Sequence, residues 1–101
     1  MKYITLICVA GMSTSMMVAR MKDAAKKNGI DAQITAMSES SFGSYDGQTD
    51  VLLLGPQISY KYNDIKSRYE TENRKVAVIE ARKYGMMDGE AVLNDALALI
   101  G

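Results

Sequence analysis

Four short apolar runs mark the chain, and amphipathic segments lie between them and after the last. The runs span residues 3–7, 32–37, 51–54 and 75–79. Three of them are nearly continuous in apolar and β-branched residues, which is typical of strands buried on both faces of a parallel sheet. The second run is different because Gln33 and Thr35 separate its apolar positions, which favours a sheet edge. The pattern therefore predicts four strands, with the second at an edge.

Three longer segments have the apolar spacing of helices packed on one face. They span residues 13–27, 58–69 and 88–100. Ser13 or Thr14 is expected to cap the first helix, and Asn28-Gly29 to end it in a left-handed turn. Asp88 is expected to cap the last helix. The tyrosines of the middle segment are expected to pack against the core, and they are Tyr60, Tyr62 and Tyr69.

The remaining connections carry weaker patterns. Residues 38–47 are rich in Ser and Gly, and Ser38 is placed to cap a short helix ahead of the Asp46-Gly47 turn. Residues 80–87 are expected to form a loop.

Strands and helices alternate along the chain, which indicates an α/β fold of one domain over residues 1–101. We expect a single four-stranded parallel sheet of order 2-1-3-4, with helices on both faces and right-handed crossovers. In this order the direction of winding reverses between the first and third strands. Ligands bind such sheets at the carboxyl ends of the strands that flank the reversal. Here those ends are residues 8–15 and Gly55-Pro56-Gln57.

The composition of the chain excludes several classes of function and of catalytic site. The chain has 12 basic and 12 acidic residues and is 48% apolar, so a nucleic-acid-binding polycation is not expected. It has one cysteine and no histidine, which excludes an internal disulfide, a Cys-His dyad and a Ser-His-Asp triad. No metal site or cofactor is expected. The apolar run at the amino terminus is too short for a signal peptide or a membrane span, which favours a reducing cytoplasm.

Cys8 is the candidate nucleophile. It follows the first strand, and a cysteine close to a helix amino terminus lies among outward-pointing amides that favour the thiolate. A phosphoryl group on Cys8 would carry about −1.5 to −2 charges, which backbone amides at a helix start can bind. The residues expected to bind it are Val9, Ala10, Gly11, Met12, Ser13, Thr14 and Ser15. They add three hydroxyls but no basic side chain. The alternative is that Cys8 is simply a small buried apolar residue.

Three motifs together resemble a known family. They are residues 8–15 (CVAGMSTS), 53–57 (LLGPQ) and 84–89 (YGMMDG). In this register the chain resembles enzyme IIB of the bacterial phosphotransferase system (PTS), in the lactose/cellobiose family that includes the IIB proteins for cellobiose and N,N'-diacetylchitobiose. The resemblance implies that Cys8 takes a phosphoryl group from a histidine of a IIA protein and passes it to a sugar entering through the membrane component IIC.

The same resemblance implies how such a carrier works in the cell. It implies a cytoplasmic phosphoprotein that docks transiently on IIA and, at the inner face of the membrane, on IIC. We expect it to act as a monomer, because its cysteine loop must be exposed to two partners in turn. Met12 and Met16 flank the loop and could form an apolar rim for docking. The sugar is expected to be of the cellobiose, chitobiose or lactose class.

Two other functions remain open at this point. A cysteine loop after the first strand of a flavodoxin-like sheet also resembles the low-molecular-weight tyrosine phosphatases and some arsenate reductases. Their loops follow the pattern C-x5-R, whereas Thr14 stands at the place of the arginine. Asp88 is the nearest candidate for the general acid of such an enzyme. The third alternative is a flavodoxin-like or receiver-like binding module in which Cys8 is incidental, although no carboxylate ends the first strand.

Overall fold

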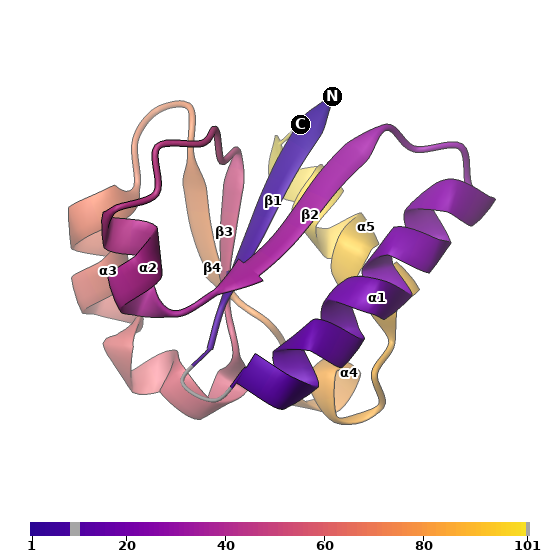
Figure 1. The fold of residues 1–101 in the computed structure, drawn as a ribbon. Coiled ribbons are helices and arrows are strands. Elements are labelled where there is room, and N and C mark those ends of the chain that lie inside the picture. The colour runs from indigo at the N-terminus through magenta and orange to yellow at the C-terminus, as the bar shows by residue number, and fades with distance from the viewer. Residues whose placement is uncertain (9–10, 101) are drawn as a thin grey trace.

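Four parallel strands form the sheet at the centre of the fold (Figure 1). They are β1 (Lys2–Ile7), β2 (Ala32–Met37), β3 (Val51–Leu54) and β4 (Lys75–Val78). The computed structural model describes residues 1–8 and 11–100, and of residues 11–13 the backbone only. The strand order is β2-β1-β3-β4, so the predicted order and the edge position of β2 are both confirmed.

Helical segments cover both faces of this sheet (Figure 1). They are α1 (Gly11–Lys27), α2 (Glu39–Gly43), the 3-10 helix η1 (Pro56–Lys61), α3 (Tyr62–Tyr69), α4 (Ala81–Gly85) and α5 (Gly89–Ile100). The helices α1 and α5 pack side by side on one face, and α2 and α3 lie on the other. None of the helices in the described part of the chain is long and apolar enough to cross a bilayer.

Two apolar clusters, one on each face, explain the continuous apolar pattern of β3. Successive side chains of a strand point to opposite faces, so a strand buried on both faces contributes alternately to the two clusters. Val51 and Leu53 belong to the cluster beneath α1 and α5, whereas Leu52 and Leu54 belong to the cluster beneath α2 and α3. All four are at most 3% exposed. The strand β3 is therefore held on both sides.

Three predicted helix ends are confirmed. Gly29 has a positive φ of 66° at the end of α1. The Ser38 hydroxyl accepts a hydrogen bond from the Ser41 amide at the start of α2. The Asp88 carboxylate accepts one from the Ala91 amide, at 3.1 Å, in the first turn of α5.

Three expectations about local structure are wrong. The helix α1 begins at Gly11 rather than Ser13, so Ser13 and Thr14 lie inside its first turn and not at its cap. Residues 81–85 form α4 where a loop was expected, and its one buried residue is Tyr84. Tyr60 is 76% exposed because it lies in η1, whose three residues per turn rotate it away from the face expected of an α-helix. Tyr62 and Tyr69 do pack against the second cluster.

Replacing Asp88 with alanine should lower the free energy of unfolding by about 0.5–2 kcal/mol, because it removes the side-chain acceptor that caps α5. Urea denaturation followed by circular dichroism measures this change. Asp88→Asn keeps a capping oxygen and should be close to the wild type. Equal losses in the two variants would contradict the capping role.

Candidate functional site

Cys8 lies directly after β1, where the carboxyl ends of β1 and β3 meet. The Gly55 amide donates a hydrogen bond to the Ile7 carbonyl at 3.0 Å. A Cβ atom placed on Gly55 would lie 3.6 Å from the Cys8 sulfur, so the turn after β3 passes close to the thiol. The two segments that topology singled out, residues 8–15 and 55–57, therefore approach each other at Cys8.

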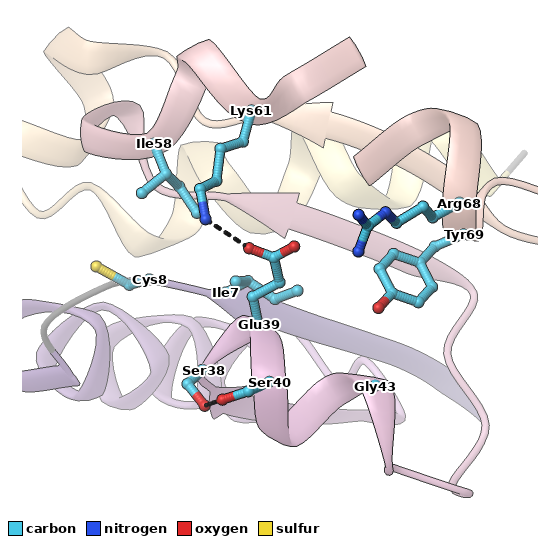
Figure 2. A pocket seen from close by; sticks show the side chains of 10 residues that line it. All are labelled: Ile7, Cys8, Ser38, Glu39, Ser40, Gly43, Ile58, Lys61, Arg68 and Tyr69. Carbon is cyan, nitrogen blue, oxygen red and sulfur yellow. Dashed lines mark hydrogen bonds and ion pairs between the residues drawn. The ribbon is translucent and has the colours of Figure 1, made fainter. Parts of the chain in front are cut away.

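The Cys8 side chain borders an open pocket of about 450 Å³. Only 7% of the residue is exposed, but it belongs to neither apolar cluster. A thiol that served only as core packing would be surrounded by apolar side chains. Instead, the sulfur lies at one end of a pocket that is lined by both polar and apolar residues (Figure 2). This placement allows Cys8 to act as a nucleophile.

The first turn of α1 begins three residues after Cys8. The chain between Cys8 and Gly11 can span no more than about 11 Å, so the start of α1 stays near the sulfur. The amides of Gly11, Met12 and Ser13 are in the first turn, where they have no acceptor within the helix. The helix dipole adds positive potential at the same end. These amides can bind an anion attached to Cys8.

The structure describes only some of the other residues predicted to bind the phosphoryl group, and these do not all face Cys8. Val9 and Ala10 lie outside the described residues, as do the side chains of residues 11–13, including the Met12 of the expected rim. Thr14 is 2% exposed, and its hydroxyl forms a buried hydrogen bond of 3.3 Å with the Tyr84 hydroxyl. Ser15 borders a different hollow, between α1 and β2. Of the three hydroxyls expected at the phosphate, that of Thr14 is thus directed into the interior.

The far wall of the pocket carries charged side chains that sequence reasoning did not place there. Glu39 comes from α2, Lys61 from η1 and Arg68 from α3, beside Ser38, Ser40 and Tyr69 (Figure 2). The Lys61 ammonium donates to the Glu39 carboxylate at 2.8 Å, which connects the two sides of the pocket. The hydrogen bond and the charge of Glu39 raise the pKa of Lys61 above the ordinary lysine value. Lys61 therefore stays protonated at neutral pH.

One signal in the sequence pointed to part of this wall. Ser38 and Glu39 follow β2, and the carboxyl ends of parallel strands meet at one edge. Lys61 and Arg68 gave no such signal, because they alternate with apolar residues as the solvent-facing side of a helix does. Among the described residues, no group of three or more Cys, Asp or Glu side chains is placed to hold a metal ion.

Known proteins match both the sequence and the fold. A family model described as the lactose/cellobiose-specific IIB subunit of the PTS matches residues 3–95. The galactose-specific EIIB component of Lactococcus lactis subsp. cremoris is 40% identical over an alignment of 97 residues, and the match covers 91% of this chain and 90% of that protein. The oligo-beta-mannoside-specific EIIB component of Bacillus subtilis is 36% identical over 100 residues, covering 99% and 97%.

Two solved structures have the same architecture. The solution structure of a cellobiose-specific phosphotransferase IIB component from Borrelia burgdorferi has a TM-score of 0.80 and 34% identity, and the match covers 98% of this chain and 91% of that one. A lactose-specific IIB domain from Streptococcus pneumoniae has a TM-score of 0.83 at 14% identity, with 100% and 98% covered, and shows the shared fold alone. From the matching family model and these relatives, the chain belongs to the lactose/cellobiose-specific IIB family of the bacterial phosphotransferase system.

Proposed function

We propose that Cys8 is the residue of this IIB component that carries the phosphoryl group, taking it from a phosphohistidine of a IIA protein and passing it to a sugar. Family membership makes the chain a phosphoryl carrier in PTS sugar transport. The observation that carries the assignment to Cys8 is its place at the end of the central strand, beside an open pocket and three residues before α1.

In the first step, the Cys8 thiolate attacks the phosphorus atom of the donor phosphohistidine. The S–P bond forms as the N–P bond breaks, and the electron pair of that bond returns to the imidazole nitrogen, which takes up a proton. In the second step, a sugar hydroxyl oxygen attacks the phosphorus atom, the thiolate leaves, and the hydroxyl proton is released. Solvent supplies the proton taken up in the first step and accepts the one released in the second, so the two steps balance.

The loop amides would stabilise the charge that develops on the phosphoryl oxygens in both steps. We propose that the amides of residues 9–15 surround the phosphoryl group. The position of Gly11, Met12 and Ser13 in the first turn of α1 supports this assignment for their amides. The Thr14 contribution would come from its amide, since its hydroxyl bonds to Tyr84. The proposal assigns no metal or cofactor to this chain.

Partners and location follow from the two steps. The donor would be a IIA protein, and the acceptor sugar would enter through a membrane IIC permease, so we place the chain in the cytoplasm and transiently at the inner face of the membrane. We keep the prediction of a monomer. The side chain of Met16 is 52% exposed, and we keep the prediction that it contributes to an apolar docking rim. The relatives are named for galactose, oligo-beta-mannosides and cellobiose, and we propose a sugar of the cellobiose, chitobiose or lactose class.

The phosphatase or arsenate-reductase alternative is not favoured. Such an enzyme clamps the phosphate with the arginine of C-x5-R, but Thr14 stands there and is buried against Tyr84. Asp88, the candidate acid, accepts a hydrogen bond from Ala91 as the cap of α5. Without the guanidinium group, attack of water on the phosphocysteine should be slow, which suits a carrier.

A reconstituted relay tests the proposed function. The protein is incubated with phosphoenolpyruvate, the general PTS proteins and a cognate IIA, and membranes containing IIC and a candidate sugar are then added. We expect a phosphoprotein that persists in buffer and loses its phosphate to the sugar when IIC is present. Rapid turnover of p-nitrophenyl phosphate, with no phosphoprotein accumulating, would favour the phosphatase instead.

Removing the charge of Lys61 and removing the charge of Glu39 should change the rate of phosphoryl uptake in opposite directions. Lys61→Met removes the ion-pair partner of Glu39 and one positive charge from the pocket that Cys8 borders, and it should slow uptake of the anionic phosphoryl group about two- to fivefold. Glu39→Gln leaves the Lys61 ammonium uncompensated and should raise the rate by a similar factor. Stopped-flow transfer from phospho-IIA measures both, and the differences should shrink as salt is added. Changes of the same sign would contradict an electrostatic effect.

A further inference from the structure

The segment from Tyr84 to Gly89 contacts α1 at two places along the helix. The phosphoryl-transfer steps described above do not involve this segment. It joins α4 to α5 on the face of the sheet that α1 covers. The first contact, near the amino end of α1, is the hydrogen bond between the Tyr84 and Thr14 hydroxyls, at 3.3 Å. Tyr84 is 5% exposed and Thr14 is 2% exposed, so this bond is shielded from water. It connects α4 to the first full turn of α1.

The second contact lies further along α1, at Gly89. A Cβ atom on Gly89 would come within 2.5 Å of the Arg20 carbonyl carbon and 2.6 Å of the Met21 amide nitrogen. These are backbone atoms of a helix, which cannot move aside as the end of a flexible side chain can. Glycine therefore lets α5 begin in direct contact with the backbone of α1.

The turn between the two contacts is held by its own backbone hydrogen bonds. The Met87 amide donates to the Tyr84 carbonyl at 3.0 Å, and the Asp88 amide donates to the Lys83 carbonyl at 3.0 Å. Met87 itself has a positive φ of 52°, a conformation that non-glycine residues adopt infrequently. Both contacts with α1 therefore come from one hydrogen-bonded turn.

We propose that residues 84–89 form a brace that fixes the amino-terminal turn of α1 against the sheet, and that Tyr84 is a positioning residue for phosphoryl transfer at Cys8. The inference rests on the proposed function of Cys8. The amides of Gly11, Met12 and Ser13 precede Thr14 on the same helical turn, so anchoring Thr14 fixes their direction. Preorganised donors stabilise a developing charge without having to reorient at the moment of reaction. The brace supplies this preorganisation from outside the cysteine loop.

Tyr84→Phe removes one oxygen from the brace and leaves the buried ring in place. We expect transfer from phospho-IIA to slow about tenfold, since small misplacements of positioned groups have large effects on rate. We also expect the amide NMR signals of residues 11–13 to shift in the unphosphorylated protein and to respond less to phosphorylation. Thr14→Val should have the same effects, Thr14→Ser should restore the wild-type rate, and the double variant should be no slower than either single one.

Tyr45→Phe is the matched control, because it also removes one tyrosine hydroxyl, but from a ring packed against the apolar cluster on the opposite face of the sheet. Its transfer rate should stay at the wild-type value. The brace proposal is overturned if Tyr84→Phe transfers at the wild-type rate with unchanged amide signals, or if Tyr45→Phe slows transfer as much as Tyr84→Phe does. A wild-type protein that takes no phosphate on Cys8 would instead overturn the proposed function, and the amide signals of the unphosphorylated variants would still test the brace.

Discussion

Replacing Cys8 with serine should reduce phosphoryl uptake from phospho-IIA by roughly a thousandfold or more. Serine has nearly the same size, but its hydroxyl does not ionise as a thiol does, so the loop would hold no usable nucleophile. Serine would also form a stable phosphate ester if it reacted, and onward transfer to a sugar would stop. The rate of phosphoprotein formation in the reconstituted relay measures this change.

The control for this variant is its fold. Cys8 lies outside both apolar clusters, so Cys8→Ser should change the free energy of unfolding by no more than about 1 kcal/mol, as urea denaturation can show. Uptake at the wild-type rate in the folded variant would show that Cys8 is not part of the mechanism. It would favour the alternative of a binding module in which Cys8 is incidental.

Replacing Gly89 with alanine should lower the free energy of unfolding by about 1–3 kcal/mol, the range typical of overpacking. The added Cβ would overlap the backbone of α1 at Arg20 and Met21, so α5 must move away from α1 or the start of α5 must unwind. Either change weakens the cluster that these two helices bury. Urea denaturation of the purified variant measures the loss.

Gly85 offers the matched control, since it lies four residues earlier at the end of α4. A Cβ atom there meets nothing within 4 Å, and its φ is not in the positive region. Gly85→Ala should leave stability unchanged or raise it slightly, because alanine lowers the entropy of the unfolded chain. If both substitutions destabilise equally, the contact of Gly89 with α1 is not the cause.

The sheet could be predicted from the sequence because each strand has a distinct pattern of burial. Three apolar runs indicated buried strands, and the polar alternation at Gln33 and Thr35 indicated an edge. In the structure Gln33 is exposed and Ile34 is the buried residue of β2. The reversal of winding also placed the expected ligand-binding edge at Cys8. Parallel topology makes this inference strong, since all four strands end at the same edge.

The local errors arise where tertiary contacts decide the structure. The helix α4 has five residues, too few for apolar periodicity to appear, and it is held by the burial of Tyr84. The segment before α3 is a 3-10 helix, so the expected α-helical face was wrong at Tyr60. The helix α1 begins at Gly11, although Gly11-Met12 carries no helix-start signal stronger than Ser13-Thr14.

The site itself was predictable only in part. A cysteine after the central strand can be recognised from the chain, but the polar wall of its pocket is assembled from α2, η1 and α3. Residues such as Lys61 and Glu39 are 22 positions apart and meet only in the folded protein. The Thr14 hydroxyl points into the interior because it bonds to the Tyr84 hydroxyl, 70 positions away. No local sequence pattern indicates this contact.

Mapping the phosphate by tandem mass spectrometry shows whether the Cys8 sulfur carries it. The wild-type protein is phosphorylated through the general PTS proteins and IIA, digested at a pH at which thiophosphates survive, and its peptides are sequenced. We expect a single phosphoryl group on the Cys8 sulfur, which is lost when IIC and the sugar are added. Phosphate on any other side chain, or a protein that stays unmodified while the relay delivers phosphate to the sugar, would contradict it.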